Sequence, residues 1–137
     1  MELKFKVEVN AVKETIWSYY AEPTKRHIWE EDLENITFNG DIKTGTTGTM
    51  KLKEMPEMPF TLTNIVPNAS YWDRTDVLGM GSLFFGHDIL HEDGKTYIQH
   101  SVRLAKENPS DEDLNFLLGV FSDVPSAVMK IKKEVEV

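Results

Sequence analysis

The feature that most constrains the fold is a long amphipathic helix predicted near the end of the chain. Between Ser110 and about Val135, apolar residues recur at steps of three and four, which places them along one face of a helix. They are Leu114, Leu117, Leu118, Phe121, Val124, Val128, Ile131 and Val135. An apolar stripe of this length has to pack against another element, because water disfavours its exposure.

Residues within this helix mark its start and a bend. Ser110 and Asp113 stand at the two positions of a capping box, which satisfies free amides at a helix start. Pro125 lacks a backbone donor and crowds the carbonyl of Phe121, so we expect the helix to bend near Phe121. A bent helix on a curved sheet leaves room for a hollow between them.

The rest of the chain predicts strands, with short helices near the start. Residues 2–9 alternate between apolar and polar side chains, as a half-buried strand does. We expect Asn10 to cap a helix that runs to about Tyr20, and Pro23 to open a second short helical turn that ends near Trp29. Turn residues then divide residues 33–105 into about six strands, at Gly40, 44–48, 56–59, 67–69, 79–81 and Asp93-Gly94. This order predicts an α+β domain that spans all 137 residues.

Composition excludes several classes of function. The formal net charge of -8 argues against a nucleic acid or an anionic membrane as partner, because either needs a concentrated positive surface. The chain contains no cysteine, which excludes disulfides, thiolate metal sites and cysteine nucleophiles. We expect no signal peptide, since a strand pattern begins at once, and no membrane insertion, since no apolar run approaches membrane-spanning length. The expectation is therefore a cytoplasmic monomer or homodimer without a cofactor.

The order of elements resembles the START-like, or SRPBCC, superfamily, and within it the polyketide cyclase/dehydrase-like and Bet v 1-like proteins. The resemblance rests on that order and on four short stretches: Val9-Asn10-Ala11 with Ile16-Trp17, the 23–29 turn, Gly45-Thr46 with Gly48, and Pro109-Ser110. It implies a helix-grip fold, in which a curved seven-stranded antiparallel sheet wraps around the kinked terminal helix. It also implies a cavity for an apolar or amphipathic molecule. The superfamily includes lipid carriers, hormone receptors, aromatase/cyclases and cochaperone domains, so the fold does not choose a function.

The Asp93-Gly94 turn predicts the register of one hairpin. A two-residue turn of this type pairs Glu92 with Lys95. Counting back pairs Leu83 with Leu104, Phe85 with Val102, His87 with His100 and Ile89 with Ile98. These pairs share one face, which is apolar except for the two histidines and should therefore face the helix. The histidines are then either a polar anchor for a ligand or a hydrogen-bonded pair with only a structural role.

Candidate site residues follow from this geometry and from the methionines and aromatics of the neighbouring strands. For catalysis the candidates are His87, His100 and Asp73, although the inward phase of the strand Tyr71 to Asp76 stays open between Tyr71 with Asp73 and Trp72 with Arg74. Trp29 is the candidate at the mouth of the cavity. The full set expected to contact a ligand is Trp17, Trp29, Met50, Leu52, Phe60, Leu62, Phe85, His87, His100, Val102, Leu117, Phe121 and Val124.

Two other patterns favour structural interpretations. A zinc site at the histidine pair needs a third ligand, and neither Asp73 nor Glu54 stands at a metal-binding spacing, so no metal is predicted. The carboxylates of residues 30–34 lie near the expected mouth, but a run of charges is usually a solvated face.

Three functions are compatible with the sequence. The first is binding or carriage of a small hydrophobic molecule, such as a lipid, without turnover. The second is a polyketide cyclase, aromatase or dehydratase activity with His87 and His100 as acid and base. The third is a cochaperone-like module that binds a protein through its sheet. A cavity with converging polar groups favours the first two, and a filled interior favours the third.

Overall fold

The computed structural model describes residues 1–136. The chain begins with strand β1 (Glu2–Val9), followed by helices α1 (Lys13–Ala21) and α2 (Pro23–Trp29). Six strands follow in succession: β2 (Leu33–Phe38), β3 (Thr47–Leu52), β4 (Met58–Val66), β5 (Ser70–Val77), β6 (Gly81–Glu92) and β7 (Lys95–Ala105). Helices α3 (Asp111–Phe121) and α4 (Val124–Val135) complete the domain.

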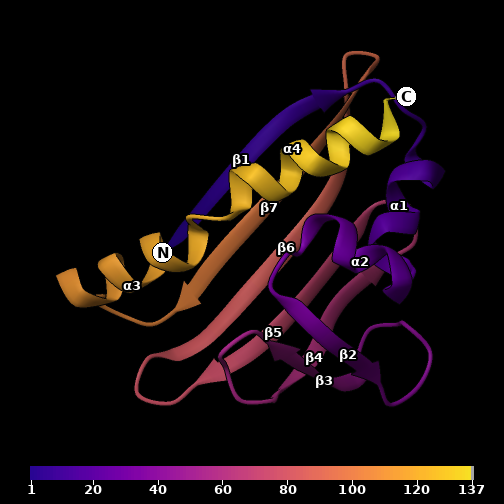
Figure 1. Ribbon diagram of the computed structural model, residues 1–137. Helices are drawn as coiled ribbons and strands as arrows, with labels where there is room; N and C mark the ends of the chain where they lie inside the picture. The colour runs from indigo at the N-terminus through magenta and orange to yellow at the C-terminus, as the bar shows by residue number, and fades with distance from the viewer. Residues whose placement is uncertain (137) are drawn as a thin grey trace.

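All seven strands form one antiparallel sheet in the order β1-β7-β6-β5-β4-β3-β2. Figure 1 shows α4 lying along β1 and β7, with α1 and α2 on the same side of the sheet. The helix-grip architecture expected from the sequence is therefore confirmed, including the six strands after α2.

The capping box and the bend of the terminal helix are also confirmed. The Asp113 amide donates to Ser110 Oγ at 3.1 Å, and the Ser110 amide donates to Asp113 Oδ2 at 2.8 Å. The bend at Pro125 is sharp enough to divide the segment into α3 and α4, with Ser122 and Asp123 between them. Figure 1 shows α3 diverging from the line of α4.

Two smaller expectations were wrong. Asn10 does not cap α1, because the residue at that position is Val12, and the Asn10 amide instead donates to Glu136 Oε2 at 2.8 Å. The segment Asp111–Val135 does meet the length and composition of a membrane-spanning helix. Uninterrupted apolar residues alone do not reveal this segment, because its mean hydropathy is high although polar residues interrupt the apolar ones. This is weak support for a membrane span, because the test uses length and composition only, and here the buried residues of the bent segment pack on the sheet.

The core consists of two clusters under the two halves of the terminal segment. Val128 and Ile131 of α4 pack with Ile16, Tyr20 and Ile98, whereas Leu117 of α3 packs with a separate group on β6 and β7. That second group contains Leu83, Val102 and Leu104. The start of α4, where the bend lies, belongs to the partly buried margin of both clusters. The bend is therefore where the packing leaves space.

Candidate functional site

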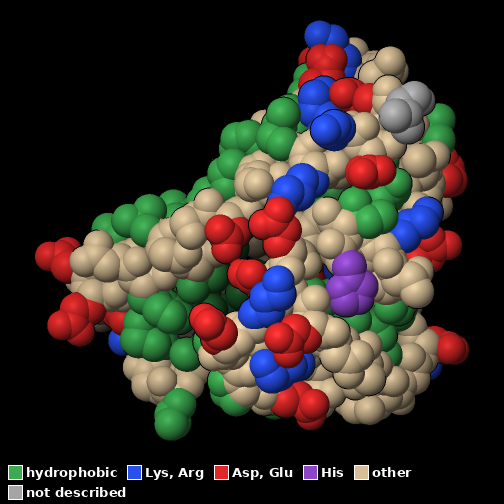
Figure 2. Space-filling model, in the orientation of Figure 1, with side chains coloured by type: hydrophobic (Ala, Val, Ile, Leu, Met, Phe, Trp, Pro, Cys, Tyr) green, Lys and Arg blue, Asp and Glu red, His purple; other side chains and the backbone are tan. Residues whose placement is uncertain are grey.

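A cavity of about 390 Å³ lies beneath the first half of α4. The inner faces of β3, β5, β6 and β7 form its floor, and α2 with the following segment closes one side. Figure 2 shows acidic side chains around a hollow with apolar surface inside it. Its lining is Arg26, Trp29, Glu30, Glu31, Asp32, Leu33, Met50, Leu52, Asp73, Phe85, Gly86, His87, His100, Ser101, Val102, Asp123, Val124, Ser126, Ala127 and Lys130.

The predicted histidine pair is present and lines this cavity. The register of β6 and β7 places His87 opposite His100, and their ring centroids lie 4.7 Å apart with the planes nearly perpendicular. His87 Nδ1 lies 2.8 Å from the carbonyl oxygen of Tyr71, so Nδ1 carries the proton and donates it. His100 Nε2 lies 2.9 Å from the Tyr20 hydroxyl. Each ring is therefore held by its own partner and not by the other histidine.

Both histidines are neutral at pH 7. Burial lowers the pKa of His87 to about 3, and the positive charge of Arg26 acts in the same direction. Burial also holds the pKa of His100 well below its usual range, with His87 and Arg26 adding to the effect. Neutral imidazoles with such low pKa values suit fixed polar contacts better than proton transfer near pH 7.

The structure resolves the phase of the strand Tyr71 to Asp76. Tyr71, Asp73 and Thr75 are buried on the inner face, whereas Trp72 and Arg74 lie on the outer face. Asp73 is only 7% exposed, lines the cavity, and has no hydrogen-bond partner for Oδ1. Burial raises its pKa to about 7, Arg26 partly opposes that rise, and Glu30 adds to it. Asp73 is therefore a cavity carboxyl that titrates near neutral pH.

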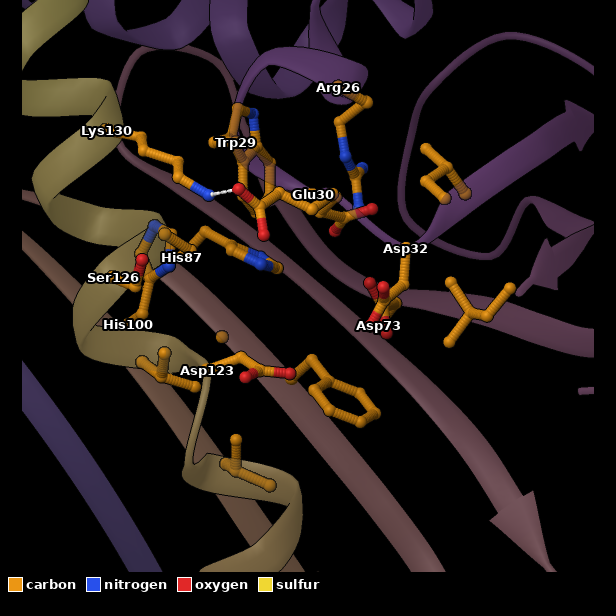
Figure 3. A pocket seen from close by; sticks show the side chains of 18 of the residues that line it. Arg26, Trp29, Glu30, Asp32, Asp73, His87, His100, Asp123, Ser126 and Lys130 are labelled. Atoms are coloured by element: carbon orange, nitrogen blue, oxygen red, sulfur yellow. Dashed lines mark hydrogen bonds and ion pairs between the residues drawn. The ribbon is translucent and has the colours of Figure 1, made fainter. Parts of the chain in front are cut away.

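Sequence reasoning missed Arg26, the buried cation of the site. Its side chain is buried, with Nη1 donating to the Tyr71 hydroxyl at 3.0 Å and Nη2 donating to Glu30 Oε1 at 2.6 Å. The guanidinium also lies 4.8 Å from the ring centroid of Trp29. Its neighbours Lys25 and His27 are not buried, and only the four-residue spacing to Glu30 hinted at an ion pair. Figure 3 shows Arg26 and Glu30 lying together at one side of the cavity.

The acidic run is a solvated face only in part. Glu34 is exposed, does not line the cavity and pairs with Lys51. Glu31 and Asp32 are exposed but lie at the cavity rim, where Glu31 forms an ion pair with Lys130 of α4. That pair links the segment after α2 to α4 at the cavity rim.

Eight of the thirteen residues expected to contact a ligand line the cavity: Trp29, Met50, Leu52, Phe85, His87, His100, Val102 and Val124. The other five do not line it. Phe60, Leu62 and Leu117 are fully enclosed in the core, because their strands or helix turn them toward packed neighbours. Trp17 packs edge-on against Tyr20 and Tyr71, and Phe121 is half-buried beside the α3 cluster.

The possible third metal ligands do not form a site with the histidines. Glu54 lies in the exposed turn after β3, away from the cavity lining. Within residues 1–136, no three His, Asp or Glu side chains are grouped to hold a metal ion.

Comparison with solved structures identifies the same fold in proteins of diverse sequence. Aha1 from Colwellia psychrerythraea, solved as a dimer, matches with a TM-score of 0.72 and 13% identity over 100% of this chain and 97% of its own. Ara h 8.0201 matches with a TM-score of 0.72 and 12% identity over 98% and 97%. Truncated norcoclaurine synthase from Thalictrum flavum matches with a TM-score of 0.69 and 16% identity over 98% and 92%.

Comparison of the amino-acid sequence with known families and curated proteins finds no relative. No family model matches the chain, and no curated protein matches it significantly. At identities of 12 to 16%, the structural matches establish the fold but indicate no activity. The chain has the helix-grip fold of these solved structures, as its order of elements predicted.

Proposed function

We propose that this protein binds a small apolar or amphipathic molecule in the cavity beneath α4. The observation that carries the proposal is a cavity of about 390 Å³ whose apolar walls meet a few buried polar groups. The apolar part of the cavity wall is formed by Met50, Leu52, Phe85, Val102 and Val124. Small-molecule sites are typically concave, about 300 to 1,000 Å³ in volume, and mostly apolar with a few placed polar groups.

The cavity favours ligand binding over a cochaperone-like role. A module that acts only through its sheet surface gains nothing from unfilled interior volume, and voids in a core cost stability. The solved structures with this fold do not choose between these two functions. They include norcoclaurine synthase, which is an enzyme, as well as Aha1 and Ara h 8.0201. We further propose that the protein works in the cytoplasm as a monomer or homodimer.

A neutral apolar fluorophore tests the proposal. N-phenyl-1-naphthylamine should bind saturably with a Kd in the micromolar range, about -8 kcal/mol in binding free energy. Replacing Ala127 by tryptophan should weaken that binding at least tenfold, because Ala127 lines the cavity and the indole would fill it. Fluorescence titration and isothermal calorimetry measure both values.

Met129 supplies the matched control. It lies on the exposed side of the same helix, so M129W adds the same ring outside the cavity and should leave the Kd unchanged. Thermal unfolding of both variants checks that each is folded. Absence of saturable binding to the native protein, or equal weakening by both variants, would refute binding in this cavity.

A second candidate function, acid-base catalysis of a cyclase or dehydratase type, is favoured by Asp73. A buried carboxyl with a pKa of about 7 inside a cavity suits a general acid or base, whereas the two neutral histidines do not. Any molecule that copurifies can be identified by native mass spectrometry and incubated with the native protein and with D73N. Turnover by the native protein that falls about a hundredfold in D73N would support catalysis. A ligand whose covalent structure stays unchanged by chromatography and NMR would support simple binding, because cyclisation alone conserves the mass.

A further inference from the structure

The charged end of the cavity has a chemistry that its apolar walls do not explain. We infer that the bound molecule carries a protonated amine on an apolar body, with the amine held between Asp73 and Glu30. This inference rests on the proposed binding function and narrows it to one ligand class.

The first support is a pair of buried acceptor atoms without partners. Glu30 Oε2 and Asp73 Oδ1 are both shielded from water and accept no hydrogen bond within the described residues. Asp73 is more than nine-tenths buried and lines the cavity. A buried acceptor that lacks a donor destabilises the folded protein, and more so when it is charged. An ammonium group offers up to three donors and a positive charge to such atoms.

The second support is the charge balance of the lining. Five carboxylates line the cavity, namely Glu30, Glu31, Asp32, Asp73 and Asp123, against two cations, Arg26 and Lys130. Both cations already have partners, since Arg26 pairs with Glu30 and Lys130 pairs with Glu31. Within residues 1–136, Asp32, Asp73 and Asp123 form no ion pair. The cavity therefore attracts a cation and repels an anion.

The neutral polar groups also favour a donor on the ligand. His87 uses Nδ1–H for the Tyr71 carbonyl, which leaves Nε2 of its neutral ring as an acceptor. Arg26 Nε is an unpartnered donor in the same cluster, but Glu30 already balances its charge. Acceptors and negative charge thus exceed donors and positive charge at this end of the cavity.

Three ligands with one apolar skeleton test the inference: 2-(2-naphthyl)ethylamine, 2-(2-naphthyl)ethanol and 3-(2-naphthyl)propanoic acid. Calorimetry at pH 8 keeps the amine protonated and most of the Asp73 carboxyl ionised, since its pKa is about 7. The amine should bind at least tenfold more tightly than the alcohol, and the acid should bind more weakly than the alcohol. D73N should remove most of the preference for the amine, measured as the ratio of the Kd values of the alcohol and the amine.

Control variants make each outcome decisive. E34Q removes an exposed carboxylate of the same acidic run that does not line the cavity, and should leave the preference intact. E30Q provides a second test at the site, so the inference does not depend on the folding of D73N alone. Alcohol binding with equal or tighter acid binding would overturn the amine assignment and leave the binding function standing, as would a preference that survives in both D73N and E30Q. Failure of all three ligands and of the neutral fluorophore would instead overturn the binding function itself.

Discussion

Replacing Arg26 by methionine should lower the free energy of unfolding by about 3 kcal/mol at pH 7, the lower end of the range for breaking a buried ion pair. Methionine keeps an unbranched apolar stem against the neighbouring rings but leaves Glu30 and Asp73 without the cation. The lower end applies because the Glu30 side chain is 22% exposed, so the ion pair is not fully enclosed. Chemical denaturation of both proteins measures the difference.

Lys25 provides the control for this prediction. It precedes Arg26 on α2 but is partly exposed, and its ion pair with Glu22 lies near the surface. K25M should cost less than about 1 kcal/mol, as exposed pairs do. Loss of Arg26 should also move the pKa of Asp73 further upward, because the guanidinium opposes the effect of burial there. A cost for R26M no larger than that for K25M would contradict the buried network.

The hairpin of β6 and β7 was predictable from sequence because local chemistry determined it. Asp93 and Gly94 both adopt positive φ, at 51° and 77°, as a two-residue turn of this type requires. Once the turn is known, the period of two in a strand assigns every facing pair, including His87 with His100. The capping box and Pro125 allowed the same kind of local argument for the terminal helix.

The charged part of the site was not predictable in that way. In β5, both phases of the strand carry polar and aromatic side chains, so alternation could not decide whether Asp73 or Trp72 faces inward. The outcome depends on β6, where Gly86 lacks a side chain and the ring of Trp72 occupies the space above it on the outer face. Arg26 reaches the cavity only because α2 packs over the sheet. This tertiary contact cannot be inferred from the residues next to Arg26 in the sequence.

Lowering the pH from 6.5 to 5 should destabilise D73N by about 3 kcal/mol through the histidine pair. Both imidazoles have folded pKa values far below the unfolded value of 6.5, so the unfolded state binds more protons throughout this range. The slope per histidine rises from about 0.7 kcal/mol per pH unit at pH 6.5, where the unfolded ring is half protonated, to about 1.4 at pH 5. Their contribution is fully present above pH 6.5 and is lost progressively toward the folded pKa values. Denaturation curves across the range give this slope.

The native protein should lose only about half as much, because Asp73 acts with the opposite sign. Burial raises its pKa from 3.8 to about 7, so the folded state binds the extra proton between these values. Its contribution to stability is therefore greatest at low pH and is lost as the pH rises through 7. As the pH falls from 6.5 to 5, Asp73 adds about 2 kcal/mol to the free energy of unfolding, which offsets part of the loss from the histidines.

Variants of single histidines in the D73N background separate the contributions. H100Q keeps a polar group opposite Tyr20 but removes one titrating ring, so the slope should fall by about half. H91Q alters an exposed histidine at the hairpin end and should leave the slope unchanged. NMR titration of His87 and His100 reports their protonation directly. Ordinary titration of both rings near pH 6.5, with equal slopes in H100Q and H91Q, would show that water reaches both imidazoles and would contradict their burial on the cavity floor.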